Sequence, residues 1–473
     1  MSEFLPPHTE ADFESNFTQL KPLMNSTEAY YESSRCLFCY DAPCVNACPT
    51  GIDIPLFIRQ INSDNIFGAA KTIFDSNYFG HACGKVCPTE VLCEGACVYN
   101  HSDVKPIEIG RLQSFATDKA IVADKMFYTP AAKNGKKVAV IGAGPAGISC
   151  ACQLRLHGYE VDIFDSKAMP SGLTMHGVAP YKITNEDVLD EMAYLEKQFG
   201  YRLFHNTTIS AKEDIEQLQR NYNAIFLGIG LGSTSDLNIP GEDLENVFGA
   251  VEFIEELKIH HHFVSVPKKV IVLGGGNTAM DAASESARMG AETVILAYRR
   301  SKEEMGAYEF EYDLAKGVGV KGMFNVTPIE IVRTKDMSGA EVPLVAELSQ
   351  EDENGRSKHR GFRGKTGSDV SGVRFIRTFS ENDQVTNIPG TEFFEECDMV
   401  IKATGQSKQK SFLNLISGLQ TNVNGTIQVN DVFQTTNKKY FAAGDAVSGG
   451  QEVVNAVADG KKAAKGIMKY LGM

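Results

Sequence analysis

The hydrophobic positions of the chain change their period near residue 130. Upstream, the apolar residues recur at helical spacing, and the segment 63–76 is the clearest case. Four of its apolar residues share one helical face: Ile66, Ala70, Ile73 and Phe74. We expect Ser63 to be the N-cap of this helix. Cysteine-containing loops interrupt the helical pattern, which predicts a small helical domain over residues 1–130, followed by a polar linker at 129–137.

Downstream of the linker, buried strands alternate with helices. KVAVIG predicts a strand, a Gly-rich turn follows, ISCACQLRLHG predicts a helix, and YEVDIFD predicts a second strand. This order is typical of a doubly wound βαβ fold. KKVIVLGGGNTAMDAASESARMG and the strand TVILAYRR repeat it. The pattern therefore predicts an α/β protein with two Rossmann-like nucleotide-binding domains. The polar, Gly-rich segment 349–372 is interpreted as a hairpin loop.

Composition and charge narrow the class of protein. The 473 residues suffice for two to four domains. The net charge of −14 argues against nucleic acid or an anionic membrane as a main partner. No apolar run is long enough to span a bilayer, and the acidic start MSEFLPPHTEADFESNF lacks the apolar core of a secretory signal. The expected compartment is the cytoplasm.

The first glycine-rich turn has the form G-x-G-x-x-G between a strand and a helix. Its proposed nucleotide-binding residues are Gly142, Gly144, Pro145, Ala146 and Gly147. In such a turn the glycines permit a tight bend, close approach of a pyrophosphate and close packing of helix on strand. Asp165 ends the second strand, where an acid binds ribose hydroxyls. The combination is much more specific than the glycines alone.

The C-terminal stretch YFAAGDAVSGGQEVVNAVADGKKAAKGI resembles the flavin-contacting motif of two-dinucleotide-binding flavoprotein reductases. That resemblance implies that Gly444 and Asp445 contact FAD. It also implies a discontinuous FAD domain over 131–245 and 390–473, with a nicotinamide domain over 246–389. The apolar stretches 224–230 and 399–405 resemble the crossover segments between such domains, although plain core strands would look the same.

The second glycine-rich turn has the form G-x-G-x-x-A, a variant common in nicotinamide-binding domains of such reductases. Its proposed residues are Gly274, Gly276, Asn277 and Thr278. Arg299 and Arg300 stand where NAD sites usually place an acid. Guanidinium groups suit a 2′-phosphate, which favours NADPH over NADH. Alternatively, these arginines stack on adenine or pair with an acid of the following SKEEM.

Eight of the eleven cysteines fall within residues 36–97. They form two groups, of which the first is Cys36, Cys39, Cys44 and Cys48 and the second is Cys83, Cys87, Cys93 and Cys97. Thiolates suit zinc or iron–sulfur clusters, and structural disulfides are uncommon in a reducing compartment. The Cys-Pro after a run is typical of bacterial ferredoxins, in which the fourth cysteine serves another cluster. A flavin in the same chain favours iron–sulfur clusters over zinc, because flavin and clusters together form an electron chain.

The chain as a whole resembles the N-terminal half of dihydropyrimidine dehydrogenase and its bacterial electron-input subunit. It is also similar to the small subunit of NADPH-dependent glutamate synthase. The stretches that carry the resemblance are RCLFCYDAPCVNACPTGIDIPLFI, GAAKTIF, ACGKVCPTEVLCEGAC, PIEIGRLQSFATD, VAVIGAGPAG and VLGGGNTAMD. The form DAPC, the CPT pairs and IGRLQSFAT favour the dihydropyrimidine dehydrogenase branch.

The resemblance implies two [4Fe–4S] clusters with different ligands. Cluster one would be held by Cys36, Cys39, Cys44 and Cys97, and cluster two by Cys48, Cys87, Cys93 and Gln113. Cys83 would then be spare, whereas the spacing alone makes it the eighth ligand and leaves Gln113 an ordinary helix-surface amide. The family's P-G-G-L after the second FAD strand is Pro170-Ser171-Gly172-Leu173 here, so Gly172 and Leu173 are counted as FAD-contacting residues.

The implied activity is electron transfer from NAD(P)H through FAD and the two clusters to a partner subunit. No side chain is expected to act as a catalytic acid, base or nucleophile. No residues remain for an FMN domain that reduces pyrimidines, so the expected partner is an FMN-containing dihydropyrimidine dehydrogenase catalytic subunit that reduces uracil or thymine. The first alternative is the small subunit of glutamate synthase with its large subunit as partner. The second, from another class, is a zinc-stabilised binding module on an inactive reductase fold.

Overall fold

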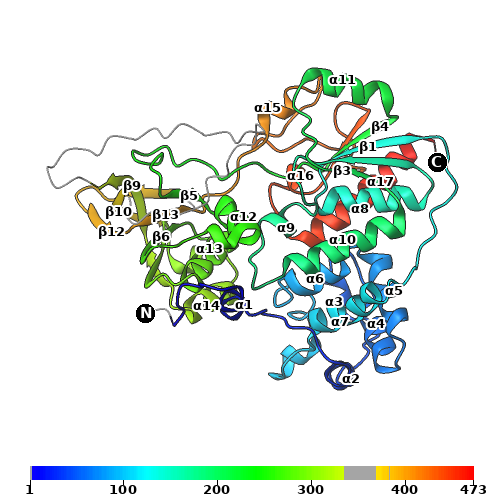
Figure 1. Ribbon diagram of the computed structural model, residues 1–473, viewed down its shortest axis with the longest axis horizontal. Helices are drawn as coiled ribbons and strands as arrows, with labels where there is room; N and C mark the ends of the chain where they lie inside the picture. Colours follow the sequence, from blue (N-terminus) through cyan, green and yellow to red (C-terminus); the bar gives the residue numbers. More distant parts are fainter. Residues whose placement is uncertain (1–2, 335–368, 383, 473) are drawn as a thin grey trace. The chain divides into compact units, whose positions relative to one another are not determined.

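The computed structural model describes residues 3–334, 369–382 and 384–472. The chain forms two compact units (Figure 1). The larger unit comprises Gln19–Gly232 and Lys408–Met473, and the smaller unit comprises Met1–Thr18 and Ser233–Ser407. No helix among the described residues is both long and apolar enough to cross a membrane.

The first part of the larger unit is helical, as the sequence predicts. Its elements are α2 (Ser26–Ser34), α3 (Pro43–Asn46), α4 (Ile54–Asn62), α5 (Ile66–Ser76), α6 (Gly80–Val86), η1 (Val98–Ser102) and α7 (Ile109–Val122). Their apolar faces meet in one core, in which Phe57, Ile73 and Leu112 are fully buried. The cysteines of both groups lie in the loops and short helices between these elements.

Helix α5 starts later than the sequence predicts. Its N-cap is Asn65, whose side chain accepts a hydrogen bond from the backbone N–H of Gly68 (3.1 Å). The prediction of Ser63 as the N-cap is wrong, because Ser63 instead ends α4 and donates from its hydroxyl to the carbonyl of Arg59 (3.0 Å). The predicted apolar face is otherwise present, since Ile73 and Phe74 are fully buried.

The second part of the larger unit is a five-stranded parallel sheet covered by helices. Its strands are β1 (Lys137–Ile141), β2 (Glu160–Phe164), β3 (Arg202–Phe204), β4 (Ala224–Leu227) and β14 (Tyr440–Ala442), in the order β14-β4-β1-β2-β3. The helices are α8 (Pro145–Leu156), α9 (Leu173–His176), α10 (Asn185–Phe199), α11 (Lys212–Asn221), α15 (Lys410–Leu413), α16 (Asp445–Ser448) and α17 (Val453–Tyr470). This arrangement confirms the predicted doubly wound fold. The C-terminal strand β14 completes the sheet beside β4.

The smaller unit holds a second five-stranded parallel sheet. Its strands are β5 (Val247–Gly249), β13 (Met399–Lys402), β6 (Lys269–Leu273), β7 (Thr293–Tyr298) and β8 (Lys321–Phe324), in that spatial order. An antiparallel sheet adjoins it, with β9 (Val326–Arg333), β10 (Val370–Glu381), β11 (Gln384–Asn387) and β12 (Phe393–Glu396). The helical elements are α1 (Glu10–Asn16), α12 (Ala250–His260), η2 (His261–Phe263), α13 (Asn277–Arg288), η3 (Lys302–Glu304) and α14 (Glu309–Gly317). Most of the predicted hairpin loop at 349–372 lies outside the described residues.

The stretches 224–230 and 399–405 contain one strand of each parallel sheet. Strand β4 lies in the first sheet and strand β13 lies in the second, and every residue of both strands is buried. The chain passes from one unit to the other shortly after each strand, at 232–233 and 407–408. The pattern agrees with the interpretation of both stretches as crossover segments. The division into three domains with boundaries at 130, 245 and 390 stays a prediction.

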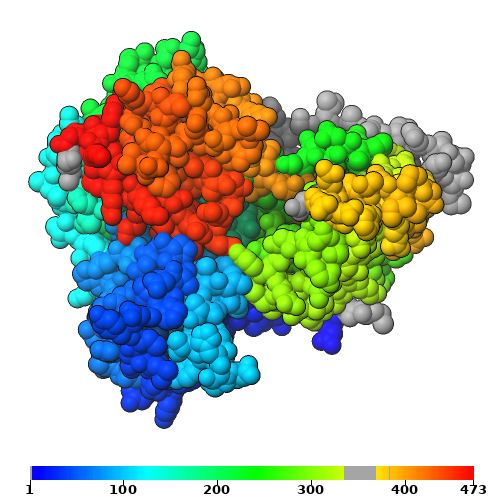
Figure 2. Space-filling model, turned by 180° about the vertical axis from the view of Figure 1, so that it is seen from behind, coloured from blue at the N-terminus to red at the C-terminus, as the bar shows by residue number. Residues whose placement is uncertain are grey.

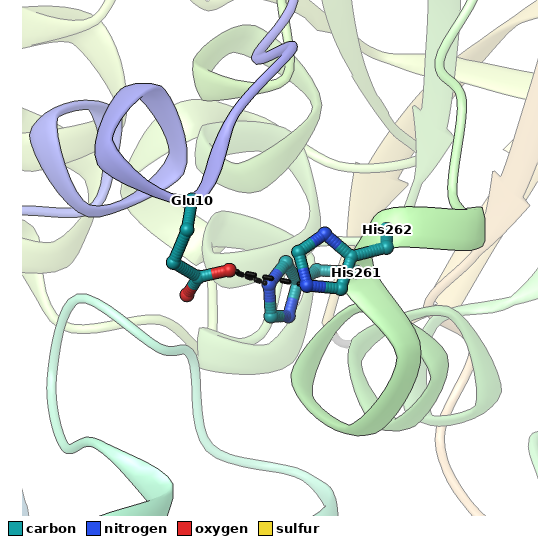
Figure 3. Close-up of side chains that lie close together, drawn as sticks. All are labelled: Glu10, His261 and His262. Carbon is teal, nitrogen blue, oxygen red and sulfur yellow. Dashed lines mark hydrogen bonds and ion pairs between the residues drawn. The ribbon is translucent and has the colours of Figure 1, made fainter.

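The N-terminal residues belong to the smaller unit, although the sequence places them in the helical domain. Helix α1 packs through Phe13, whose ring stacks on that of His261 with centroids 4.0 Å apart. Glu10 pairs with the Nε2 atoms of His261 (2.8 Å) and His262 (3.2 Å), as Figure 3 shows. The amide of Asn16 donates to the carbonyl of Arg288 (2.7 Å). These contacts hold α1 against the end of α12, which periodicity alone does not reveal.

A glycine allows α17 to lie against α8, and Figure 1 shows the two helices side by side. A Cβ atom at Gly460 would lie 2.2 Å from the carbonyl oxygen of Ala146. Figure 2 shows the segment of α17 against the N-terminal helical domain. Lys461 of α17 donates to the carbonyls of Asp75 (2.7 Å) and Ser76 (2.9 Å) at the end of α5. One helix thus joins the sheet to the cysteine-bearing domain.

We predict that Gly460→Ala destabilises the protein by about 1–3 kcal/mol, because the added methyl group forces α17 away from α8. The lower thermal midpoint of the larger unit is measurable by scanning calorimetry. Gly317→Ala in α14 is the matched control, since a Cβ there meets nothing within 4 Å. An unchanged midpoint for Gly460→Ala would contradict the proposed close packing.

Candidate redox site: two cysteine cavities and a glycine-rich loop

Four cysteines from distant parts of the helical domain line one cavity, the first cavity. They are Cys36, Cys39, Cys44 and Cys97, the set that the sequence analysis assigns to cluster one. Cys36 follows α2, Cys44 lies in α3, and Cys97 precedes η1. The remaining walls are mostly apolar, with Ile54, Ile58, Ile107 and Ile109 among the lining residues. The fold therefore brings the distant Cys97 to the three cysteines at 36–44.

Burial raises the pKa of two of these thiols, Cys36 and Cys44. It raises the pKa of the Cys44 thiol to about 12, and the neighbouring Cys36 and Cys97 raise it further. A positive metal centre reverses this effect, because a coordinating thiol loses its proton. Four thiols in one apolar cavity fit an iron–sulfur cluster, and the sulfur-only donor set matches the ligands of [4Fe–4S] centres.

A second cavity lies beside the first and contains the other predicted ligand set. Its lining includes Cys48, Cys87, Cys93 and Gln113, together with Cys83. Ile54 lines both cavities, so the two are neighbours. Cys48 follows α3, whereas Cys87 ends α6 and Gln113 lies on α7. The second cavity thus gathers five candidate ligands, one more than a cubane cluster needs.

Two glycines bring the ligands of α6 and α7 together. A Cβ at Gly84 would lie 2.7 Å from the carbonyl oxygen of Gly110, and a Cβ at Gly110 would lie 2.6 Å from that of Gly84. The two helices therefore touch through their backbones. This approach places Cys83 and Cys87 on the same cavity as Gln113.

Gln113 is oriented by its own amide nitrogen. The Nε2 atom donates to the carbonyl of Gly80 (2.7 Å), and the side chain is buried. Because Nε2 is used in this way, the Oε1 atom is the group left to ligate iron. Cys83 lines the same cavity, and a hydrogen bond with Cys83 and burial together raise the pKa of Cys87. Cys83 and Gln113 are therefore the two candidates for the fourth ligand position of cluster two.

Charged residues of α10 hold α6 in place. Glu191 is fully buried and accepts hydrogen bonds from the backbone N–H groups of His81 (2.7 Å) and Ala82 (3.1 Å). Burial raises the pKa of Glu191 to about 7. Asp187 pairs with Lys85 at 2.6 Å and with His81 at 3.1 Å. This buried network fixes the helix that carries Cys83 and Cys87 against the nucleotide-binding part of the unit.

The first glycine-rich loop has the geometry of a nucleotide cradle. Gly142 has φ 100°, and a Cβ there would lie 2.3 Å from the carbonyl oxygen of Gly228. A Cβ at Gly147 would lie 1.9 Å from the carbonyl oxygen of Gly142. Gly144 caps α8, and its Cβ would have no atom closer than 3.9 Å. The loop is therefore closed against the protein at Gly142 and Gly147 and open at Gly144, as close approach of a pyrophosphate requires.

The other residues expected to contact FAD surround this loop. Asp165 ends β2 and accepts from the backbone N–H of Ala143 (2.6 Å). A Cβ at Gly172 would lie 3.0 Å from the Cα of Gly144, and one at Gly444 would lie 3.0 Å from the Cβ of Ala146. The remaining members of the set are Pro145, which starts α8, Leu173, which starts α9, and Asp445, which starts α16. The structure thus brings together all the residues that the sequence analysis assigns to FAD.

Ser171 is a feature of the site that the sequence analysis treats as a mild departure from P-G-G-L. It has φ 88°, a left-handed conformation that glycine adopts without strain. Its hydroxyl is buried and has no hydrogen-bond partner within the described part of the chain. A bound FAD would supply polar atoms in this region, so the unpartnered hydroxyl fits a ligand here.

The second glycine-rich loop lies at the end of β6. Gly276 caps α13, and a Cβ there would meet nothing within 4 Å, which leaves the helix N-terminus open. Asn277 and Thr278 start α13, and the amide oxygen of Asn277 accepts from the backbone N–H of Tyr308 (3.0 Å). Gly274 precedes this turn, with its backbone N–H bonded to the carbonyl of Ala297 (3.0 Å).

Arg299 and Arg300 follow β7, the strand next to β6. Arg299 is exposed and Arg300 is half-buried. Glu304 of SKEEM accepts from the hydroxyl of Ser380 (2.6 Å) and the backbone N–H of Ser301 (3.0 Å), and these hydrogen bonds, together with the charge of Arg300, lower its pKa. The exposed guanidinium of Arg299 is available to a nucleotide phosphate.

Three residues that line or contact the second cavity were not found from the sequence. Val454 of α17 lines this cavity, which places the C-terminal helix of the nucleotide-binding part next to a cysteine site. Asn77 also lines it. Lys21 donates to the carbonyl of Cys87 (3.1 Å) and the hydroxyl of Thr89 (2.7 Å). None of the three residues belongs to a recognisable motif. Only Asn77 has a sequence signal for a place near the cluster ligands, because it begins the stretch NYFGHACGKVCP that contains Cys83 and Cys87.

Two family profiles match the chain. Residues 13–125 match dihydropyrimidine dehydrogenase domain II, 4Fe-4S cluster, and residues 136–460 match pyridine nucleotide-disulphide oxidoreductase. The first match favours iron–sulfur clusters over the zinc-stabilised module considered above. Together the two profiles account for both cysteine cavities and both glycine-rich loops.

Proteins of similar sequence are named as subunits or chains of dehydrogenases and of glutamate synthase. The NAD-dependent dihydropyrimidine dehydrogenase subunit PreT of Escherichia coli K12 is 34% identical, covering 96% of this chain and 97% of PreT. The glutamate synthase [NADPH] small chain of the same organism is 32% identical, with 96% and 94% covered. The NADP(+)-dependent formate dehydrogenase subunit beta of Moorella thermoacetica is 32% identical, with 91% and 60% covered.

Solved structures share the fold of the nucleotide-binding part. Mycobacterium tuberculosis FprA in complex with NADPH matches with a TM-score of 0.53 at 18% identity, covering 71% of this chain and 84% of FprA. Thioredoxin reductase of T. acidophilum matches with a TM-score of 0.50 at 20% identity, covering 71% of this chain and 98% of that chain. These likenesses agree with the two Rossmann-like domains predicted from the sequence.

We predict that Gly144→Ala weakens FAD binding about tenfold or more while the protein still folds, because the new methyl group points into the open side of the cradle. Flavin content after purification and titration of the deflavinated protein with FAD measure the effect. Gly317→Ala again serves as the control. Unchanged FAD affinity would argue that the pyrophosphate does not approach Gly144.

The ligands of the second cavity are distinguished by three substitutions. We expect Cys87→Ser and Gln113→Ala each to lose or alter one cluster, and Cys83→Ser to retain both; loss of one of two cubanes removes about half of the iron. Iron and sulfide analysis of anaerobically purified protein provides the measurement. A loss of iron in Cys83→Ser with normal iron in Gln113→Ala would reverse the assignment.

Proposed function

Because the chain belongs to the pyridine nucleotide-disulphide oxidoreductases that carry an N-terminal 4Fe–4S domain, we propose that it passes electrons from NAD(P)H to a separate catalytic subunit. It is an NAD(P)H-dependent flavin oxidoreductase. The observation that carries the proposal is the position of Val454. This residue of α17 lines the second cysteine cavity, while Gly460 of the same helix packs on Ala146 of the flavin-binding loop.

The bound groups supply the redox chemistry, with two-electron hydride acceptance by the flavin and one-electron transfer by the clusters. The protein binds these groups, orients them and excludes water. The Gly142–Gly147 loop and Asp445 bind FAD, and Cys36, Cys39, Cys44 and Cys97 hold cluster one. Cys48, Cys87, Cys93 and Gln113 hold cluster two. No side chain serves as a nucleophile or as a general acid or base.

The two cavities give the electron path a direction. The second cavity includes a residue of the flavin-binding part, Val454, whereas every lining residue of the first cavity comes from the helical domain. Ile54 connects the two. Cys48, Cys87, Cys93 and Gln113 would therefore hold the cluster nearer the flavin-binding part, and Cys36, Cys39, Cys44 and Cys97 would hold the cluster farther from it. The loop around cluster one exposes Leu37 (61%) and Tyr40 (99%), a suitable surface for leaving electrons.

The nicotinamide donor is proposed to be NADPH. Arg299 and Arg300 stand at the end of β7, where a guanidinium can pair with a 2′-phosphate. The relatives differ on this point, since PreT is named as NAD-dependent and the glutamate synthase small chain as NADPH-dependent. The two arginines favour NADPH over NADH as the donor for this chain.

The acceptor is proposed to be an FMN-containing dihydropyrimidine dehydrogenase catalytic subunit that reduces uracil or thymine. The identity to PreT over almost the whole of both chains supports this choice. A glutamate synthase large subunit is the second candidate, supported by the similar identity to the glutamate synthase small chain. Both candidates require the same outward flow of electrons.

We predict that the chain alone oxidises NADPH with ferricyanide as acceptor but reduces uracil only when the FMN subunit is added. The reason is that the cysteine cavities and glycine-rich loops are proposed to bind electron carriers, whereas pyrimidine reduction is assigned to the FMN subunit. Anaerobic assays of uracil loss and NADPH oxidation measure the coupling, and counts of iron, sulfide and flavin verify the loaded protein.

A parallel assay with the glutamate synthase large subunit and 2-oxoglutarate plus glutamine separates the two acceptors. Glutamate formation without uracil reduction would identify the glutamate synthase large subunit as the acceptor. Quantitative uracil reduction by the chain alone, or coupling to neither subunit, would refute the proposed relay.

A further inference from the structure

Asn77 is an amide whose orientation is set by the backbone around it. It ends α5, and its backbone N–H donates to the carbonyl of Ile73 (2.8 Å). Its side-chain oxygen accepts from the backbone N–H of Phe79 (2.9 Å). Because an N–H donor faces this atom, it must be the oxygen, and the NH₂ group must occupy the other position. The side chain is completely buried.

The NH₂ group of Asn77 has no acceptor among the residues that the structure describes. Its Nδ2 atom is buried without a hydrogen bond, although Asn77 lines the second cavity together with Cys48, Cys87 and Cys93. An unpaired buried donor costs about 1–3 kcal/mol. The other side-chain amide that lines the cavity is that of Gln113, and its NH₂ group donates a hydrogen bond to the carbonyl of Gly80. Asn77 therefore brings an unused donor to a site lined by sulfur.

We propose that the Nδ2 atom of Asn77 donates a hydrogen bond to a sulfur of the cluster held in the second cavity. The inference rests on the proposed function, since it requires a cluster there. Asn77 is not a ligand, because its oxygen is already bonded to Phe79. It is a positioning residue that acts on the reduction potential of cluster two.

The direction of the effect follows from electrostatics. Reduction adds an electron whose charge is shared by the sulfurs, and a hydrogen bond to a more negative acceptor is stronger. The hydrogen bond therefore stabilises the reduced cluster more than the oxidised one and raises its potential. Since the second cavity adjoins α17, Asn77 favours transfer of electrons out of the flavin. The charged groups near the cavity are bonded elsewhere, since Lys21 donates to Cys87 and Thr89 and Glu94 accepts from the backbone N–H of Gly110.

The test uses Asn77→Ala and Asn77→Ser in the cluster-loaded, full-length protein. Serine can still accept from the N–H of Phe79 in a similar turn, so it protects against a folding defect, but its hydroxyl is too short to replace the amide. EPR-monitored redox titration gives the midpoint of each cluster. At a fixed potential, we expect the reduced-to-oxidised ratio of cluster two to fall about tenfold, or 59 mV for a one-electron couple. Cluster one is the internal reference and should keep its midpoint.

A spectroscopic signature separates the hydrogen bond from a loss of packing. Protein labelled with ¹⁵N-asparagine should show a ¹⁵N coupling to reduced cluster two, and both variants should lack it. Asn62→Ala is the matched control, because its amide donates to Ser33 (3.3 Å) in the same domain but does not line the cavity. The control should retain both midpoints and the coupling.

Two results would overturn the inference, and they differ in what else they overturn. An unchanged cluster-two midpoint in both variants, with two clusters per chain and intact transfer to the FMN subunit, would refute the role of Asn77 alone. Iron and sulfide counts that show no cluster in the second cavity of the unsubstituted protein would refute both the role of Asn77 and the two-cluster relay.

Discussion

The close packing of α17 on the glycine-rich loop is the contact on which the rest of the larger unit depends. Gly460 removes the side chain that would separate α17 from Ala146, and Gly444 allows a similar approach to the same residue. The N-terminus of α17 then reaches the second cysteine cavity through Val454. If this helix moved outward, the flavin-binding loop and the second cysteine cavity would lose the helix that contacts both. Backbone proximity, more than any polar pair, connects the two parts.

The cavities themselves combine features that would be unfavourable without their cofactors. Burial of the thiols raises the pKa of Cys44 and of Cys93. The buried NH₂ group of Asn77 and the buried hydroxyl of Ser171 lack partners in residues 3–334, 369–382 and 384–472. Burial of such groups without partners raises the free energy of the folded protein. Bound clusters would supply metal cations for the thiols, and clusters and FAD would supply hydrogen-bonding atoms for the polar groups. The same groups that destabilise the empty protein are therefore suited to hold its redox centres.

Rigid support distinguishes this site from a loop that merely carries cysteines. The contact between Gly84 and Gly110 joins α6 to α7, and Glu191 of α10 binds the backbone of α6 at its N-terminal end. The distance between redox centres controls electron transfer, so a fixed scaffold is of direct use. The N-terminal residues have a different role, because α1 packs on the smaller unit through Phe13 and Glu10, while the chain from Gln19 onward belongs to the larger unit.

Much of this protein could be predicted from local sequence because the signals are local. The glycine-rich turns require particular backbone conformations at Gly142 and Gly147, and the strands before them are short apolar runs, so the doubly wound fold was predictable. The resemblance to a known family also grouped the cysteines into the sets that the structure places in two cavities.

Local signals misplaced the N-cap of α5, since Ser63 and Asn65 both have capping side chains and only the end of α4 decides between them. Likewise, no periodicity could place α1 on the smaller unit or Val454 beside the cysteines. Local sequence thus specifies the folds, the glycine-rich turns and the chemical type of the ligands. The role of α17 in joining the two parts and the unused donor that Asn77 presents to the second cavity emerge only on folding, because both depend on contacts between residues far apart in the chain.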